Sequence, residues 1–314
     1  MRSFALRLTV MNDVYYKTLI LILTIALGCV LHHIGIFDKS DAQSISKIMM
    51  NITLPCVVVK NLNGITLDLD ILAALIVGFA ANLIFLSVTF LFAKKGDPDD
   101  RVVKLFCFSS FNIGNYAIPI LSTFVDAPAM AGVLAFNYPG TAVVTYGTVP
   151  VIGKAFYGER GASPLEMLRK NVLRNVPTVT CLVMLLLCLF HIALPESVAG
   201  VFSSIASANT TLAMLSIGIL LDFKLPRSEL VSDLYVVLIR FCTAILCGAA
   251  ILFLLPASQD LRRALTLCVF APISSAMPVM ALHCGYQGSR VAVINSIYLL
   301  VSICAMSLLI LFLY

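Results

Sequence analysis

The stretch NIGNYAIP, Asn112–Pro119, interrupts an apolar segment that is long enough to cross a membrane. A second interruption, APISSAMP at Ala271–Pro278, occupies the corresponding place in the second half of the chain. Proline removes a backbone hydrogen bond from a helix interior and disfavours helical geometry in the residue before it. Because hydrocarbon cannot satisfy the freed backbone groups, both stretches are expected inside the protein or along a watery cavity.

The composition is typical of an all-α polytopic membrane protein. Of the 314 residues, 60% are hydrophobic and 12% are charged, and the mean hydropathy is +1.01, far from the mixture found in soluble domains. The apolar residues form blocks of about 20, which matches a hydrocarbon core about 30 Å thick. Ten spans are predicted, at Val14–Phe37, Ser44–Leu62, Leu69–Ala93, Val103–Phe124, Ala129–Gly153, Asn171–Leu194, Val201–Leu221, Asp233–Leu255, Leu261–Cys284 and Ser289–Phe312.

The predicted spans repeat in the two halves of the chain. Shifting the first half onto the second places Pro119 on Pro278 and superposes the spans. Five spans per half is an odd number, so the halves run with opposite topology, as in inverted-repeat transporters with crossed broken helices. The predicted units are a first repeat at 1–153, a linker at 154–170 and a second repeat at 171–314. Coincidence among evenly spaced hydrophobic blocks is the alternative.

Charge predicts the orientation of these spans. Most of the 21 Lys and Arg fall in the loops on one side of the ten-span arrangement. The positive-inside rule assigns that side to the cytoplasm, which leaves both termini outside the cell membrane.

Polar side chains inside the spans are candidates for a binding site, because burying them in hydrocarbon is costly. Asn112 and Asn115 share a helical face beside a glycine and a proline that free backbone groups for a ligand. A buried amide can instead simply join neighbouring helices, the interpretation we favour for Asn82. The other candidates are Asn51, Asn137, Asn209, Thr210, Arg240, Ser274, Ser275 and Asn295, with the chain breaks at Gly114, Pro119, Pro272 and Pro278.

The distribution of charge inside the spans favours an anionic ligand. All sixteen Asp and Glu lie in predicted loops or at span ends, whereas cation antiporters normally use buried carboxylates. Amides and positive N-terminal helix ends favour an anion, although Na⁺ can still bind through carbonyls and Asn side chains. For Arg240, inside the eighth span, two roles are open: its stem carries the charge to the interface, or it attracts the anion.

Nothing in the sequence indicates enzymatic chemistry. No two cysteines have the spacing of a metal site or a redox motif, and no metalloprotease, Walker or dinucleotide-binding motif occurs. We therefore expect no catalytic residue, no metal, no cofactor and no nucleic-acid partner.

These motifs resemble those of the auxin efflux carrier family. The N-x-x-L-P signature of that family is similar to Asn51–Pro55, and its N-x-G-N-x-G-x-P crossover is similar to Asn112–Pro119. Met277–Tyr286 and Asn295–Ser302 resemble its last two spans. The resemblance covers essentially the whole chain, although Ala117 stands where the family often has glycine.

The resemblance implies an elevator-type carrier, often a homodimer, in which spans one, two, six and seven form a scaffold and the other six move. It places Asn112, Asn115, Pro119 and Pro278 in the binding site, with Asn51 and Pro55 facing it from the scaffold. The implied ligand is a carboxylate such as malate, malonate or indole-3-acetate, and potential-driven efflux is the predicted function. A sodium- or proton-coupled symporter and a transporter-like sensor without flux are the alternatives.

Overall fold

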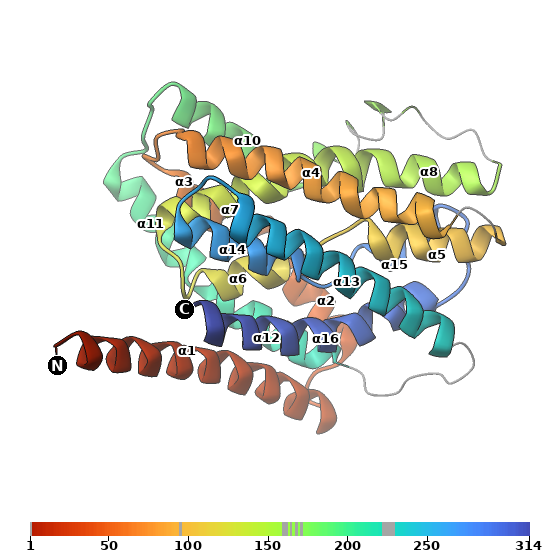
Figure 1. Cartoon of the computed structure of the whole chain (residues 1–314), viewed down its shortest axis with the longest axis horizontal. Coiled ribbons are helices and arrows are strands. Elements are labelled where there is room, and N and C mark those ends of the chain that lie inside the picture. The colour runs from red at the N-terminus through yellow and green to blue at the C-terminus, as the bar shows by residue number, and fades with distance from the viewer. Residues whose placement is uncertain are drawn as a thin grey trace.

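The computed structural model describes residues 2–93, 96–158, 163, 165, 166, 169, 172–221 and 230–314, which form helices and loops with no strand among them. The longest helices run side by side along the long axis of the molecule (Figure 1). The predicted linker, 154–170, is described only in part.

In the described part of the chain, six helical stretches are long and apolar enough to cross a membrane. They confirm the prediction of a polytopic all-α membrane protein. Four of them belong to the continuous helices α1 (Arg2–His33), α4 (Leu69–Phe92), α13 (Leu230–Leu254) and α16 (Arg290–Leu313). The other two are composite, made of α2 (Lys39–Ile48), η1 (Met49–Thr53) and α3 (Leu54–Leu62), and of α11 (Glu196–Ala206) and α12 (Ala208–Leu220).

The remaining predicted spans are shorter or interrupted. The fourth consists of α5 (Pro98–Phe108), a non-helical link at 109–112, η2 (Ile113–Ala117) and α6 (Ile118–Leu121). The ninth consists of α14 (Gln259–Val269) and α15 (Met277–His283), joined through 270–276. The fifth contains α7 (Ala127–Gly140), η3 (Thr141–Thr148) and α8 (Val149–Phe156), and the sixth contains α10 (Val176–Leu189).

Several predicted boundaries are wrong. Helices begin earlier than predicted at Arg2, Lys39, Pro98 and Glu196. Local chemistry explains two further differences. Helix α1 ends at His33 instead of Phe37, because Gly35 turns the chain with φ +79° and Asp38 then caps α2. Helix α10 begins at Val176 instead of Asn171, because Asn175 caps it by accepting the N–H of Thr178 at 3.1 Å.

Most of the described acidic residues lie at helix starts, where the helix dipole favours negative charge. Asp68 and Asp126 accept N–H groups in the first turns of α4 and α7. Asp233, in the first turn of α13, accepts Arg290 Nε at 3.0 Å. Arg290 also donates to Asp100 at 3.4 Å, so this ion network joins the starts of α5, α13 and α16.

Each of the three π-helical segments described ends two residues before a proline. The segments η1, η2 and η3 precede Pro55, Pro119 and Pro150. Proline has no N–H, and its ring crowds the carbonyl four residues earlier. The preceding turn therefore widens, and N–H groups bond five residues back, as Ile118 N does to Ile113 O.

Glycines allow two helix pairs to pack closely. A side chain at Gly28 or Gly218 would collide with the backbone of the facing helix in the α1–α12 pair. Gly78 of α4 lies against the backbone of Phe136 in α7 in the same way. One turn along, Asn82 donates to the Gly78 carbonyl at 2.8 Å and accepts from Thr145, which agrees with its predicted role in joining helices.

Candidate functional site

The two chain breaks are in direct contact. Asn112 N–H, in the first break, donates to the Pro272 carbonyl of the second break at 2.7 Å. Ser274 N–H donates in turn to Ser110 Oγ at 3.3 Å. Backbone groups that the prolines and the non-helical links leave open are therefore satisfied by the opposite break, as a buried backbone requires.

Arg240, from α13, lies at this crossing. Its side chain has 0% exposed surface. The guanidinium donates to the carbonyls of Cys107 at 2.8 Å, Phe108 at 2.9 Å, Ser110 at 2.5 Å and Ala271 at 3.3 Å. The interpretation that its stem carries the charge to the interface is therefore wrong, because the charge is bound by backbone oxygens inside the protein.

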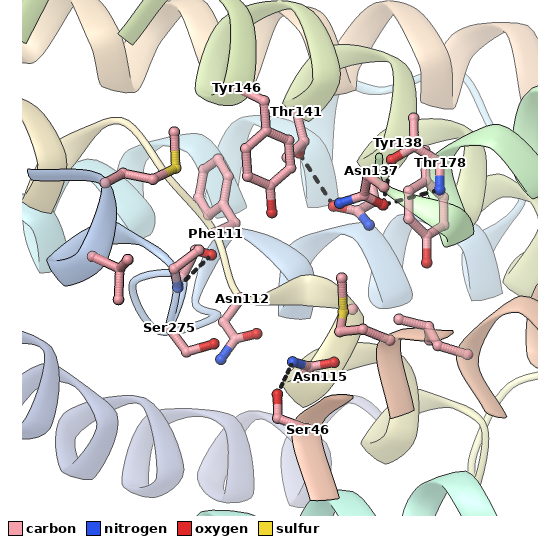
Figure 2. A pocket seen from close by; sticks show the side chains of 18 of the residues that line it. Ser46, Phe111, Asn112, Asn115, Asn137, Tyr138, Thr141, Tyr146, Thr178 and Ser275 are labelled. Atoms are coloured by element: carbon pink, nitrogen blue, oxygen red, sulfur yellow. Dashed lines mark hydrogen bonds between the residues drawn. The ribbon is translucent and has the colours of Figure 1, made fainter. Parts of the chain in front are cut away.

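A cavity of about 470 Å³ adjoins the crossing (Figure 2). Elements from both halves of the chain contribute to its wall. The structure brings six predicted residues to it: Asn112, Gly114, Asn115, Asn137, Ser274 and Ser275. Further polar side chains in the wall are Ser46, Lys47, Tyr138, Thr141, Tyr146, Asn175, Thr178 and His283.

Polar groups line the cavity, and two of them have no hydrogen-bond partner among the described residues. Asn115 donates from Nδ2 to Ser46 Oγ at 3.2 Å, whereas its buried Oδ1 has no hydrogen-bond partner among the described residues. The buried hydroxyl of Tyr138 also has none within the described part of the chain. Figure 2 shows the hydroxyl of Tyr146 and the amide of Asn112 entering the space from opposite sides.

The charge in this wall is positive. Lys47 lines the cavity, and none of its described lining residues carries a carboxylate. Within the described residues, no group of three or more His, Cys, Asp or Glu could hold a metal ion. The wall can thus donate hydrogen bonds to a negatively charged ligand and offset its charge.

A smaller cavity of about 280 Å³ continues from the first. The two cavities share Met50, Tyr146, Asn175 and Met280. The smaller one adds Arg174, a second basic residue on the path to the amides.

The other predicted site residues lie outside the larger cavity. Asn51 lines the smaller one and donates to the Lys47 carbonyl at 2.8 Å. Asn209 is buried and accepts the Thr53 hydroxyl at 2.7 Å, so it joins α12 to η1. The prolines act through the backbone before them: Pro55, Pro119 and Pro278 start α3, α6 and α15, and the Pro272 carbonyl accepts Asn112 N–H.

The sequence analysis missed Tyr138 and Tyr146, although one signal could have found Tyr146. It lies four residues before Pro150, just as Asn51 and Asn115 lie four residues before Pro55 and Pro119. That position loses its backbone partner to the proline. All three of these residues line one of the two cavities.

The comparison with protein families finds a match in the first half of the chain. The family model described as membrane transport protein, the transport domain of the auxin efflux carriers, matches residues 13–153. No curated protein matches the chain by sequence. The matched segment contains both Asn51–Pro55 and Asn112–Pro119, and it extends from within α1 to within α8. Residues 13–153 of this integral membrane protein therefore match the membrane transport domain of the auxin efflux carrier family.

Proposed function

We propose that this protein is a carrier that moves a small organic anion across the membrane by alternating access. The observation that supports the proposal is the cavity at the crossing, with its amides, hydroxyls and Lys47 and no carboxylate among its described lining residues. A carboxylate ligand accepts hydrogen bonds from amide N–H and hydroxyl groups. A cation would find there none of the buried acids on which cation pumps rely.

The start of α10 adds positive potential beside the cavity. The cap of this 14-residue helix, Asn175, and its residue Thr178 both line the cavity wall. The first N–H groups of a helix carry partial positive charge, which favours anions nearby. Together with Arg174 at the smaller cavity, this helix start makes the path to the amides attractive to an anion.

The proposal includes ten spans arranged as two inverted five-span repeats. The scaffold consists of α1, α2–α3, α10 and α11–α12, and the remaining elements form the transport domain. Packing supports this division, since α1 packs on α12 and α3 on α10 and α11, whereas α4 packs on α7 and α13 on α14. The cavity lies between the two sets, with Ser46 and Thr178 on one side and Asn112 and Ser274 on the other.

An elevator-type movement of the transport domain past the scaffold would open the cavity to each side of the membrane in turn. Placement in the cell membrane with both termini outside, and assembly as a homodimer, complete the proposal. The membrane potential supplies about 2.3 kcal/mol per charge per 100 mV, which is sufficient to drive efflux of an anion without a coupling ion.

Proteoliposomes containing the purified protein test this function. We expect malate, malonate or indole-3-acetate to move in response to an imposed membrane potential. The flux should rise in proportion to the size of that potential. Movement that requires a Na⁺ or proton gradient would identify a symporter instead. Ligand binding without any flux would identify a sensor.

Asn115→Ala tests whether the flux passes through this cavity. We expect flux to fall by about tenfold, because the variant removes an amide whose buried oxygen has no partner among the described residues. Asn61→Ala is the matched control, since the Asn61 amide donates to the Val57 carbonyl of its own helix and lies outside the cavity. Equal flux in the two variants would place the anion path elsewhere.

A further inference from the structure

Arg240 binds both chain breaks at the ends of the helices that enter them. Cys107 and Phe108 are the last residues of α5, and Ala271 follows the end of α14 by two residues. The final carbonyls of a helix lack partners within it and carry partial negative charge. One guanidinium therefore satisfies the negative ends of two half-helices that come from different halves of the chain.

Aromatic rings complete the surroundings of this charge. The guanidinium carbon lies 5.3 Å from the ring centroids of Phe85 and Phe111 and 4.8 Å from that of Tyr298. Such faces attract a cation most strongly where it is desolvated. Phe111 is also the residue before Asn112 and lines the cavity, so Arg240 contacts the cavity wall without entering the cavity itself.

Carbonyl oxygens from broken helices are the ligands with which many secondary transporters hold Na⁺. In this protein Arg240 already occupies four carbonyls of that kind. A second cation at the same oxygens would have to displace the guanidinium or share its ligands against charge repulsion.

We infer that the guanidinium of Arg240 takes the place of a bound cation at the crossing. Arg240 is a positioning residue that holds both breaks in place, and it makes a bound Na⁺ unnecessary there. For the role of Arg240 in the transport cycle, the inference rests on the proposed function. For the role of Arg240 at the crossing, it rests on geometry alone. If the inference holds, the Arg240 charge pre-organises the side of the cavity that contains Asn112. This charge is part of the protein and stays in place during transport.

Hydrogen–deuterium exchange tests the role at the crossing without any measurement of activity. In Arg240→Gln, we expect the backbone amides of 107–113 and 270–277 to exchange roughly tenfold faster or more, since several hydrogen bonds to a charge are lost. Exchange in α1 and α12 should not change. Arg262→Gln is the matched control, because Arg262 donates to a single carbonyl, that of Leu252, away from the crossing. Unchanged exchange at both breaks in Arg240→Gln would overturn the inference.

Transport by three variants distinguishes the effect of the Arg240 charge from the effect of its side-chain volume. We expect Arg240→Gln to lower maximal flux by about 10- to 100-fold, because small misplacements of a site cost that much. Arg240→Lys should recover part of the flux, because it keeps the charge without the planar fork. Arg262→Gln should stay within about twofold of the unmodified protein. Equal losses in the Lys and Gln variants of Arg240 would rule out a role for the charge.

The unmodified protein provides a test that does not depend on the folding of any variant. When choline replaces Na⁺ at equal ionic strength, flux, melting temperature and exchange at the two breaks should stay the same. Protection of 107–113 or 270–277 by Na⁺ alone would overturn the inference. If none of the three carboxylates is transported, the proposed function fails, whereas the exchange experiments still decide the role of Arg240.

Discussion

The two chain breaks use the same element, a proline that starts a short helix, yet they present different chemistry. The first break continues as a π-helix and brings two amides, Asn112 and Asn115, to the cavity. The second stays non-helical up to α15 and brings two hydroxyls, of which Ser274 is buried and Ser275 is exposed. Proline thus determines where the chain opens, and the packing around each break determines what the open segment offers to a ligand.

Substitution of an amide in the first break should have the largest effect on transport. We expect Asn112→Ala to lower the ratio of maximal flux to KM by about 100-fold, because an amide both donates and accepts hydrogen bonds to a buried ligand. Ser275→Ala, from the exposed hydroxyl side, should cost about threefold. Concentration-dependent flux in proteoliposomes measures both. Equal losses would show that the two breaks contribute equally.

Substitution of the proline in the first break should also lower flux more than substitution of the proline in the second break. In Pro119→Ala the turn before α6 can relax from π to α geometry, which turns Asn115 away from the cavity. We expect flux to fall by about tenfold. Pro278→Ala should change flux by about twofold at most, because the segment before α15 is not helical. The test is the flux of the two purified variants, normalised to the amount of folded protein measured by size-exclusion chromatography. A larger loss of flux in Pro278→Ala than in Pro119→Ala would contradict this expectation.

The basic residues should act on capture of the anion more than on its movement. We expect Lys47→Gln to raise KM by about fivefold, with a smaller change in maximal flux, because an exposed charge contributes about 1 kcal/mol. Arg174→Gln, at the smaller cavity, should raise KM by about twofold, and only at low ionic strength, since salt screens exposed charges. KM measured at two salt concentrations separates the two, and a salt-independent effect of Arg174→Gln would contradict its placement on the entry path.

The last expected effect is on amide exchange instead of transport, and it concerns a contact between the first break and the proposed scaffold. Thr210 donates to the Pro119 carbonyl at 3.1 Å and lies 3.0 Å from the Ser122 hydroxyl. An elevator movement would have to break this contact, so Thr210→Val should destabilise the present arrangement by about 1 kcal/mol. The exchange of amides in η2 and α6 should rise by roughly fivefold. No change in exchange would show that the contact does not hold the two sets of helices together.

Much of the fold could be predicted from local rules. The apolar blocks predicted membrane-crossing helices, and the prolines of Asn112–Pro119 and Ala271–Pro278 predicted two breaks that avoid lipid. Most of the described acids also lie at helix starts, although Asp13 lies inside α1. The ends of α1 and the start of α10 could not be located as well, because apolar content continues across them and a single turn or cap decides the boundary.

The lining of the cavity was predicted only in part. Asn112, Asn115, Asn137, Ser274 and Ser275 could be selected because each is a polar residue inside an apolar span. The same rule also selected Asn209, which the structure shows as a link between α12 and η1. Polarity inside a span shows that a side chain needs a partner, but it does not show whether that partner is a ligand or another helix.

The sequence alone determined where the backbone of this protein must leave the regular helix, because the ring of proline and the absence of water in hydrocarbon act on each segment locally. Only the tertiary structure decided which open segments meet and what holds them. Arg240 is separated from the carbonyls it binds by up to 133 residues along the chain, and Asn112 is hydrogen-bonded to Pro272. Such contacts depend on how all the helices pack together, since a buried charge or backbone group takes whichever partner that packing brings within reach.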